Sequence, residues 1–563
     1  MKQTTISVAD YGITPNTGED CTTLLKRILS EIKNIETATT LIFPKGEYHF
    51  YKEFGEQRQY HLSNTDSLDY PLKTIGILIE EQSNLTINGQ GSLFIFHGDF
   101  MAFALVNCKN VKLQDFSIDY QNPPTTEMVI DKVEGNKITY GIPASQTFTI
   151  EGHSIFWYEN SPIDGSTYWK YQNDYKCVNV MVYEPHQNRI ARHELEDSPF
   201  YRVNSLKEVF HESNDQMRFV EVEYGTPRPD FYEKGVRFEF SRNKFRDTSG
   251  VFIWQCENVK MNQLNVHFLY SFGWLSQMCK DITFSDCRFE SRKESGRLCS
   301  SSADLIHITG CAGKVLIENC YFTHAHDDAI NIHGAYVQIE KLLDSNSLVA
   351  FYAHGQQGGF PQFYPNDKVR ICRRDSLRPV AELTVSKSIH PDQFDGRRME
   401  IMFFESLPTE LANSSFDEVG YVIENISYTP QVEIRDCEFE MIPTRGILCT
   451  TKEQALITGN TFKSITMAAV YLSGDSEFWY EAGAIDDMTI KNNKFAPSSY
   501  WEGKKSAPII FVEPITVSGP EDDLAIHQNI RIIENHFATT PEESIVALRV
   551  ANLEVVDNTF VDD

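Results

Sequence analysis

Short runs in which apolar and polar residues alternate recur along the chain, and many of them end on one sequence template. The template has an apolar residue, a second apolar residue at +2, Asp, Asn, Glu or Gly at +4, Cys or Asn at +5 and Phe at +7. Alternation with period 2 predicts half-buried β-strands, and a recurring template predicts one structural unit used many times. Clear copies begin at Ile282, Val315, Val432, Ala455, Met488, Ile530 and Leu553, and weaker copies begin at Leu85, Val111 and Val259.

The spacing of the copies indicates how the units are joined. Starts are 23 residues apart at 259 and 282, at 432 and 455, and at 530 and 553, and 33 residues apart at 282 and 315 and at 455 and 488. A unit of this length with short strands and variable turns fits one coil of a right-handed parallel β-helix. Leucine-rich repeats have a similar length, but their LxxLxL pattern is absent, and a propeller blade needs about 40 residues. The sequence therefore predicts an all-β, right-handed parallel β-helix.

The N-terminal segment carries a helical pattern instead. Leu24, Ile28 and Ile32 recur at i, i+4 and i+8 and so lie on one face of a helix. Such a helix is expected to cap the open end of the solenoid, because an uncapped end exposes a sheet edge. Together with Asp10-Tyr11-Gly12 and Ile87-Asn88-Gly89-Gln90-Gly91, this opening resembles the start of the pectin-active β-helix enzymes, which implies the pectin-lyase-like form of the fold.

Two stretches interrupt the repeat, at residues 121–245 and 335–428. Both contain alternating segments separated by Gly, Pro and Asn-Asp, and both are aromatic-rich, so inserted β-subdomains are expected rather than disordered loops. The predicted organisation is a cap with the first coils at 1–120, a β-subdomain at 121–245, central coils with the candidate catalytic centre at 246–334, a barrel-like β-subdomain at 335–428 and C-terminal coils at 429–563.

Composition narrows the range of partners. The chain has 51 Lys and Arg against 79 Asp and Glu, a formal charge of −28, which disfavours nucleic acid, anionic membranes and polyanionic substrates. The sequence contains no apolar window of about 18 residues, so no membrane span is predicted. The opening Met1-Lys2-Gln3 lacks the pattern of a signal peptide. Twelve cysteines without a CxxC pair argue against a disulfide framework or a zinc site, and Cys287, Cys320 and Cys437 share one repeat position typical of packing.

Acidic residues concentrate in two consecutive coils, at 301–308 and 324–334. Asp304 and Asp328 are 24 residues apart, so they should stack about 4.8 Å apart, with Asp327 adjacent. All three can face solvent only from a bend before the strand, because neighbouring strand residues point to opposite faces. Carboxylates this close raise at least one pKa, which provides a general acid beside an ionised base, as in glycosidases. The alternative is that they only cap turns, as Asp286 and Asp436 are expected to do.

The paired stretches Ala303-Asp304-Leu305-Ile306 and Asp327-Asp328-Ala329-Ile330 are similar to the two aspartate motifs of the polygalacturonases. Essentially the whole chain, both interruptions included, more closely resembles glycoside hydrolase family 110, the bacterial α-1,3-galactosidases. The Arg-Ile-Lys motif of the polygalacturonases is absent, consistent with a neutral sugar. The resemblance implies that Asp327 is the general acid and that Asp304 and Asp328 orient the water as base.

The same resemblance implies an inverting exo-hydrolase that releases terminal α-1,3-linked galactose from blood-group-B-type or linear caps and requires no cofactor. The missing signal-peptide pattern leaves two alternatives, a cytosolic protein or a mature form without its leader. The second is expected, with the protein in the periplasm or outside a bacterial cell. The oligomeric state stays open, and a dimer is compatible with the sequence.

Further substrate-binding candidates surround the three aspartates. Arg445 occupies the stack position of Asp304 and Asp328 in the next coil after the interruption, where it could bind hydroxyls, or simply neutralise the carboxylates. Trp274 and Trp479 could each stack on a sugar if they are exposed, or pack in the core if they are buried. His324, His326 and His333 could instead bind a metal, but no further ligand has an obvious spacing. The candidates are His307, His326, Asn331, His333, Arg445, Trp274 and Trp479.

Two other classes of function remain open. A polysaccharide lyase would use the aspartate cluster to hold calcium and a basic residue to abstract a proton. A carbohydrate-binding or adhesin β-helix would need no catalytic carboxylate at all.

Overall fold

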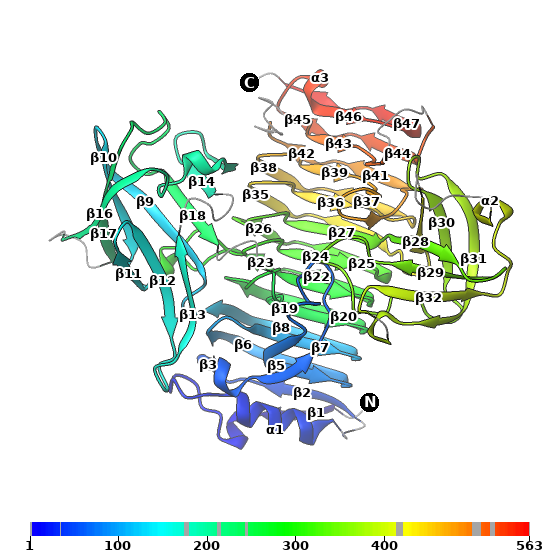
Figure 1. Ribbon diagram of the computed structural model, residues 1–563. Coiled ribbons are helices and arrows are strands. Elements are labelled where there is room, and N and C mark those ends of the chain that lie inside the picture. Colours follow the sequence, from blue (N-terminus) through cyan, green and yellow to red (C-terminus); the bar gives the residue numbers. More distant parts are fainter. Residues whose placement is uncertain are drawn as a thin grey trace.

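The computed structural model shows a long column of stacked coils with one β-rich lobe on each side (Figure 1). It describes residues 3–33, 35, 37–173, 180–210, 216–241, 246–393, 395–412, 420–497, 508–517 and 524–561. The predicted subdomain boundary at 245 and the chain end at 563 lie outside the described residues. Within these ranges the column consists of one sheet of 20 strands and one of 12, joined almost entirely by parallel pairing. The predicted right-handed parallel β-helix is confirmed.

The larger sheet covers two sides of the column. Its strands are β1 (Gln3–Ser7), β2 (Ala38–Ile42), β3 (Glu47–Tyr51), β6 (Ser83–His97), β8 (Lys109–Tyr120), β20 (Glu257–Val266), β22 (Lys280–Ser285), β23 (Arg288–Phe289), β25 (Ala312–Glu318), β26 (Tyr321–Thr323), β34 (Gln431–Arg435), β35 (Glu438–Ile442), β37 (Ala455–Thr458), β38 (Thr461–Ile465), β41 (Met488–Lys491), β42 (Lys494–Phe495), β44 (His527–Ile533), β45 (His536–Phe537), β47 (Val550–Val556) and β48 (Thr559–Phe560).

The smaller sheet forms the remaining side, on which the candidate site lies. Its strands are β4 (Glu56–Gln59), β5 (Leu72–Glu80), β7 (Met101–Val106), β19 (Val251–Trp254), β21 (Trp274–Gln277), β24 (Ile306–Thr309), β27 (Ile330–Ala335), β36 (Ile447–Cys449), β39 (Val470–Leu472), β43 (Ile510–Val512), β46 (Ile545–Ala547) and the short β40 (Glu481–Ala482), which pairs antiparallel to β27.

Each position of the sequence template has a structural reason. The first position of every clear copy stacks directly on that of the next, from Ile282 to Leu553. The +4 residue adopts a left-handed conformation, with φ of +56° at Asp286 and +70° at Gly459, which explains the choice of Asp, Asn and Gly there. The +7 phenylalanines stack with ring centroids 4.6–5.1 Å apart.

The +5 position forms two kinds of ladder. In the C-terminal coils Asn460, Asn493 and Asn535 are buried, and each side-chain amide donates to the carbonyl oxygen of the next at 3.0 Å, the last to Asn558. In the central coils Cys287, Cys320 and Cys437 take this place; they are buried and their thiols donate to backbone carbonyls. The cysteines are packing residues, as predicted.

A helix covers the N-terminal end of the column. The helix α1 (Thr22–Ile32) buries Leu25, Ile28 and Ile32 against the first coils, while Leu24 is partly buried. Figure 1 shows it beneath β2 at the end of the stack. The other described α-helices are single turns, α2 (Thr409–Ala412) and α3 (Pro541–Ser544), and no helix among the described residues is long and apolar enough to cross a membrane.

The two lobes are β-structures with their own cores. The first contains a seven-stranded sheet and a three-stranded sheet within its described residues, and the second is a closed six-stranded barrel. The first lobe comprises β9 (Thr125–Glu134), β10 (Lys137–Pro143), β11 (Phe148–Glu151), β12 (Ser154–Asn160), β13 (Thr167–Asn173), β14 (Val180–Glu184), β15 (Arg189–His193), β16 (Val203–Val209), β17 (Met217–Tyr224) and β18 (Arg237–Ser241). The barrel comprises β28 (Val337–Leu342), β29 (Ser347–Phe351), β30 (Lys368–Arg373), β31 (Pro379–Ile389), β32 (Arg398–Phe403) and β33 (Tyr421–Asn425).

Candidate active site

Outward-facing side chains of four successive coils form the floor of a pocket of about 350 Å³. The in-register pairing of β24, β27, β36 and β39 places His307, Asn331, Leu448 and Tyr471 in one column along this floor. A cavity of this size is typical of a small-molecule site, and many of the side chains that line this one are polar or charged.

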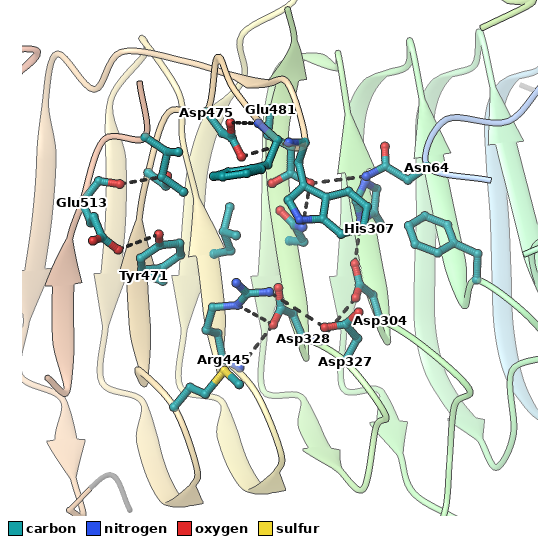
Figure 2. Close-up of a pocket in the computed structure, with 18 of the residues that line it drawn as sticks. Asn64, Asp304, His307, Asp327, Asp328, Arg445, Tyr471, Asp475, Glu481 and Glu513 are labelled. Atoms are coloured by element: carbon teal, nitrogen blue, oxygen red, sulfur yellow. Dashed lines mark hydrogen bonds and ion pairs between the residues drawn. The ribbon is translucent and has the colours of Figure 1, made fainter. Parts of the chain in front are cut away.

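The three aspartates meet at one edge of the pocket (Figure 2). Asp304 lies in the bend before β24, and Asp327 and Asp328 lie in the bend before β27, as predicted from their strand parity. The pairing of Ile306 with Ile330 puts Asp304 and Asp328 at equivalent positions of adjacent coils. One carboxylate oxygen from each of the three aspartates lies within 4.8 Å of the others.

The side chain of Asp304 is buried, and each of its two carboxylate oxygens has a polar partner. One carboxylate oxygen lies 2.7 Å from Nδ1 of His307, and the other accepts a hydrogen bond from the backbone N–H of Asp328 at 3.2 Å. Burial, and then the charges of Asp327 and Asp328, raise the pKa of Asp304 well above its usual range. These surroundings favour the protonated form of Asp304.

Asp328 is held by Arg445, which stands at the same position one coil further on. The Asp328 carboxylate accepts hydrogen bonds from the backbone N–H of Arg445 at 3.2 Å and from its Nε at 2.8 Å. Despite burial, the two aspartates nearby raise the pKa of the Arg445 guanidinium. The predicted neutralising contact is therefore present.

Asp327 projects furthest into the pocket, with 16% of its side chain exposed against 4% for Asp304 and 1% for Asp328. Arg192 and Arg246 each lie 3.0 Å from one of its oxygens, and Arg445 lies at 3.8 Å. Burial acts to raise the pKa of Asp327, but the three guanidinium groups outweigh it and hold the pKa below its usual value. In the free protein Asp327 is therefore ionised, although a general acid needs a proton there.

A carboxylate also lies on the opposite wall. Glu481 on β40 accepts hydrogen bonds from Asn64 at 3.3 Å and Asn331 at 3.5 Å, and lies 3.3 Å from Nε2 of His333. Burial raises the pKa of Glu481. The side-chain oxygen of Asn331 is buried at the pocket floor and has no hydrogen-bond partner among the described residues.

Exposed aromatic rings form the rim. Phe478 and Trp479 are 61% and 42% exposed and line the pocket. Asp475 fixes their turn by accepting three backbone N–H groups, those of residues 477, 478 and 479. The ring of His354, from the barrel, lies 4.6 Å from that of Trp479. The barrel thus supports the rim, and the predicted Trp479 stands where a sugar could stack on it.

Three of the predicted substrate contacts lie elsewhere. Trp274 is completely buried and packs on Phe284 inside the β-helix, because its strand parity directs it inward. His326 is buried and binds Glu239 of β18 at 2.9 Å, so it joins the first lobe to the column. His333 lies behind His307, with their Nε2 atoms 2.9 Å apart. None of the three lines the pocket.

Among the pocket residues that the sequence did not single out are Arg192, Asn64, Arg246 and Glu481. Arg192 lies on β15 of the first lobe and Asn64 in a loop of the first coils, both far from the aspartates in sequence. Arg246 stacks its guanidinium 4.7 Å from the ring of Phe272, which precedes Asp304 by one coil. Only Glu481 had a signal, because it directly follows the aromatic run Phe478-Trp479-Tyr480.

Two clusters among the described residues have ligand atoms close enough for a metal ion, the three aspartates and the group Glu239, Cys299 and His326. Three guanidinium groups surround the aspartates and would repel a cation there. In the second cluster both ring nitrogens of His326 already have hydrogen-bond partners. Neither arrangement favours a metal centre, and the first disfavours the calcium site of a lyase.

The chain is similar over nearly its whole length to proteins named alpha-1,3-galactosidase A. That of Streptomyces avermitilis is 32% identical, over 98% of this chain and 87% of the relative. That of Bacteroides fragilis is 30% identical, over 100% of this chain and 88% of the relative. Residues 348–414, within the barrel, match the domain family GLAA-B beta-barrel domain II. Among solved structures, an exopolygalacturonase from Thermotoga maritima aligns with 99% of this chain and 91% of its own, with 12% identity and a TM-score of 0.40.

A β-helix whose outer face carries clustered carboxylates in a pocket rimmed by aromatic rings has the acidic groups and stacking surfaces that carbohydrate-active proteins use. The extent and level of the sequence identity then define the group: the chain belongs to the α-1,3-galactosidase family, glycoside hydrolase family 110, and is a glycosidase.

The Arg445–Asp328 pair should be essential to stability. Arg445→Met leaves a carboxylate buried and unpaired, and we expect it to lower the free energy of unfolding by about 3–5 kcal/mol, measured by urea unfolding. Adding Asp328→Asn should restore part of the loss. The control is Arg435→Met, which breaks the more exposed pair with Glu318 and should cost about 0–1 kcal/mol. Equal losses in the two single variants would contradict this account.

Proposed function

We propose that this protein is an inverting exo-hydrolase that releases terminal α-1,3-linked galactose and uses Asp304, Asp327 and Asp328 for general acid–base catalysis. The observation that carries the proposal is the convergence of the three carboxyl groups at one edge of one pocket, where burial raises the pKa of Asp304 and three guanidinium groups lower the pKa of Asp327. Two carboxyl groups whose environments separate their pKa values are the arrangement that acid–base cleavage of a glycosidic bond requires.

The proposed cycle uses one proton. When the sugar displaces water from the pocket, the proton of Asp304 passes to Asp327, the most exposed of the three. Asp327 donates it to the glycosidic oxygen as the bond from that oxygen to the anomeric carbon breaks. A water molecule attacks the anomeric carbon, and its proton goes to Asp304, while Asp328 orients the water. The resting protonation state is then restored, which reconciles the acid role of Asp327 with its ionised form in the free protein.

Burial supports inversion. A retaining enzyme needs a carboxylate that bonds the anomeric carbon, yet Asp304 and Asp328 are 3% and 1% exposed and Asp327 is paired through both oxygens. The oxygens of the three lie within 4.8 Å, closer than the carboxyl spacing of about 6.5–9.5 Å usual for inverting enzymes. The attacking water would therefore bind beside the cluster rather than between two well-separated groups.

The names of the relatives and the residues that line the pocket support the proposed substrate. The relatives are named alpha-1,3-galactosidase, and galactose is neutral, in keeping with a protein of charge −28. We propose that Trp479 stacks on the apolar face of the sugar and that Asn331 and Arg445 contact its hydroxyls. Caps of the blood-group-B type and linear α-1,3-galactosyl caps are the proposed substrates.

Replacing the proposed proton carriers should abolish activity. Asp304→Asn and Asp327→Asn should each lower kcat by about 10²–10⁴-fold or more, with thermal unfolding preserved, measured on a terminal α-1,3-galactoside. The matched control is Asp436→Asn, an exposed turn residue with positive φ that Asn also adopts; it should keep full activity. Glycan binding without hydrolysis in the unmodified protein would favour an adhesin, and loss of activity with a chelator would favour a lyase.

The stereochemistry is decided by the first product. Proton NMR of a terminal α-1,3-galactoside during hydrolysis should show the β-anomer of galactose before mutarotation brings in the α-anomer. Running a branched blood-group-B trisaccharide and a linear disaccharide side by side also measures which cap is preferred. Initial appearance of α-galactose would overturn inversion, and release of no galactose would overturn the substrate assignment.

We also propose that the protein works in the bacterial periplasm or outside the cell, because galactose-capped glycans of these types are displayed on cell surfaces and secreted molecules. Fractionation of the source bacterium with an antibody should recover the protein in the periplasm or medium. Recovery confined to the cytoplasm would refute this location.

A further inference from the structure

A continuous line of close polar contacts runs from Asp304 through His307 and His333 to Glu481 on the far wall of the pocket; Figure 2 labels Asp304, His307 and Glu481. Asp304 Oδ2 lies 2.7 Å from Nδ1 of His307. Nε2 of His307 lies 2.9 Å from Nε2 of His333, which lies 3.3 Å from Oε1 of Glu481. The four residues come from β24, β27, β40 and the bend before β24. Every link is short enough for a hydrogen bond, although Glu481 is 177 positions from Asp304 along the chain.

The position of one proton in this line is fixed by its surroundings. Nδ1 of His333 lies 2.5 Å from the backbone carbonyl oxygen of Gly334. A carbonyl oxygen only accepts hydrogen bonds, so Nδ1 of His333 carries a proton. Nε2 of His333 is then bare in the neutral ring and protonated in the imidazolium, which donates toward His307 and Glu481.

The remaining contacts allow two proton arrangements. In the first, protonated Asp304 donates to Nδ1 of His307, whose Nε2–H donates to bare Nε2 of His333. In the second, His307 has the opposite tautomer: its Nδ1–H donates to ionised Asp304, and its Nε2 accepts from the His333 imidazolium, which is paired with ionised Glu481. One proton moving from Asp304 to Nδ1 of His307, and one moving from Nε2 of His307 to Nε2 of His333, convert the first into the second.

We propose that His307 and His333 form a proton relay, stabilised by Glu481, that sets the protonation state of Asp304 during catalysis. His333 and Glu481 act through His307 and are positioning residues. The relay gives the mobile proton of the free protein two sites, one on Asp304 and one on the ion pair of His333 with Glu481. The proton returns to Asp304 before it passes to Asp327, so the relay retains the proton in the buried line without changing the proton balance of the cycle.

The burial of the line supports this role. His307 and His333 are 0% and 2% exposed, so bulk water does not exchange protons with them readily. Burial, and then His333 and Arg246, lower the pKa of His307 well below its usual value, which keeps it neutral and able to switch tautomer. The charged groups that face the line from the surrounding elements are Arg246, Asp327, Asp328, Arg445 and Asp475.

The pH profile of kcat/KM tests the relay. Replacing His333, or removing the charge of Glu481, removes or destabilises the second site of the mobile proton, so the line loses this proton at a lower pH. We expect His333→Gln and the isosteric Glu481→Gln each to move the alkaline limb of the profile to lower pH, by about one unit. KM should change little in His333→Gln, because His333 does not line the pocket. The double variant should move the limb no further than His333→Gln alone.

The control is His527→Gln, which removes a buried histidine of the C-terminal coils that bonds a backbone N–H at 3.1 Å. It should lower the thermal unfolding temperature without moving the limb. If His333→Gln and Glu481→Gln lower kcat equally at all pH values and leave the limb in place, their role is only structural and the relay is wrong.

The inference rests on the proposed acid–base role of Asp304, and the two can fail separately. If Asp304→Asn retains activity, the proposed function fails. If Asp304→Asn is inactive but the limb stays in place in both relay variants, only the relay fails. Glu481→Gln keeps the shape of the side chain and an acceptor for Asn64 and Asn331, so it tests the charge even where His333→Gln does not fold.

Discussion

The stacking of one coil directly on the next, in register, is the constraint on which the rest of this structure depends. Parallel strands about 4.8 Å apart repeat every side-chain position along the column. The inward positions become stacks of phenylalanine and ladders of asparagine or cysteine. The outward positions become columns too, and on one side of the column those side chains are polar. The same register therefore builds the hydrophobic core and sets like charges beside one another at the pocket.

Like charges at such a spacing must be compensated. Asp304, Asp328 and Arg445 occupy one column, so the stack itself supplies one counter-charge. The others come from outside the stack, Arg192 from the first lobe and Arg246 from the chain segment that returns from it. The barrel in turn buttresses the aromatic rim through His354. Both lobes therefore contribute to the candidate site, and the electrostatics of the aspartates depend on how the first lobe docks.

Local periodicity explains why much of this could be predicted and some could not. The template fixes the strand alternation and the turn conformation, and so it predicted the β-helix and the buried cysteines, while strand parity predicted the bend that gathers Asp304, Asp327 and Asp328. Position along the repeat also predicted Arg445. Arg192 and Asn64 reach the pocket through the packing of separate segments, which no local pattern encodes. Trp274 was assigned to the pocket from its coil alone, whereas its inward parity, matching that of Ile306, places it in the core.

The second lobe is inserted in the sequence between two coils that stack directly on each other. Asp328 and Arg445 are hydrogen-bonded although 117 residues separate them, whereas coils joined without an insertion bring together residues 23 apart. Because the entropy of closing a loop grows only with the logarithm of its length, the longer connection costs about 1.4 kcal/mol more than the shorter one. A single additional packing contact can offset a free-energy cost of this size. The turn after β27 is thus a place where a whole domain can be accommodated, enlarged or exchanged while the coils on either side keep their alignment.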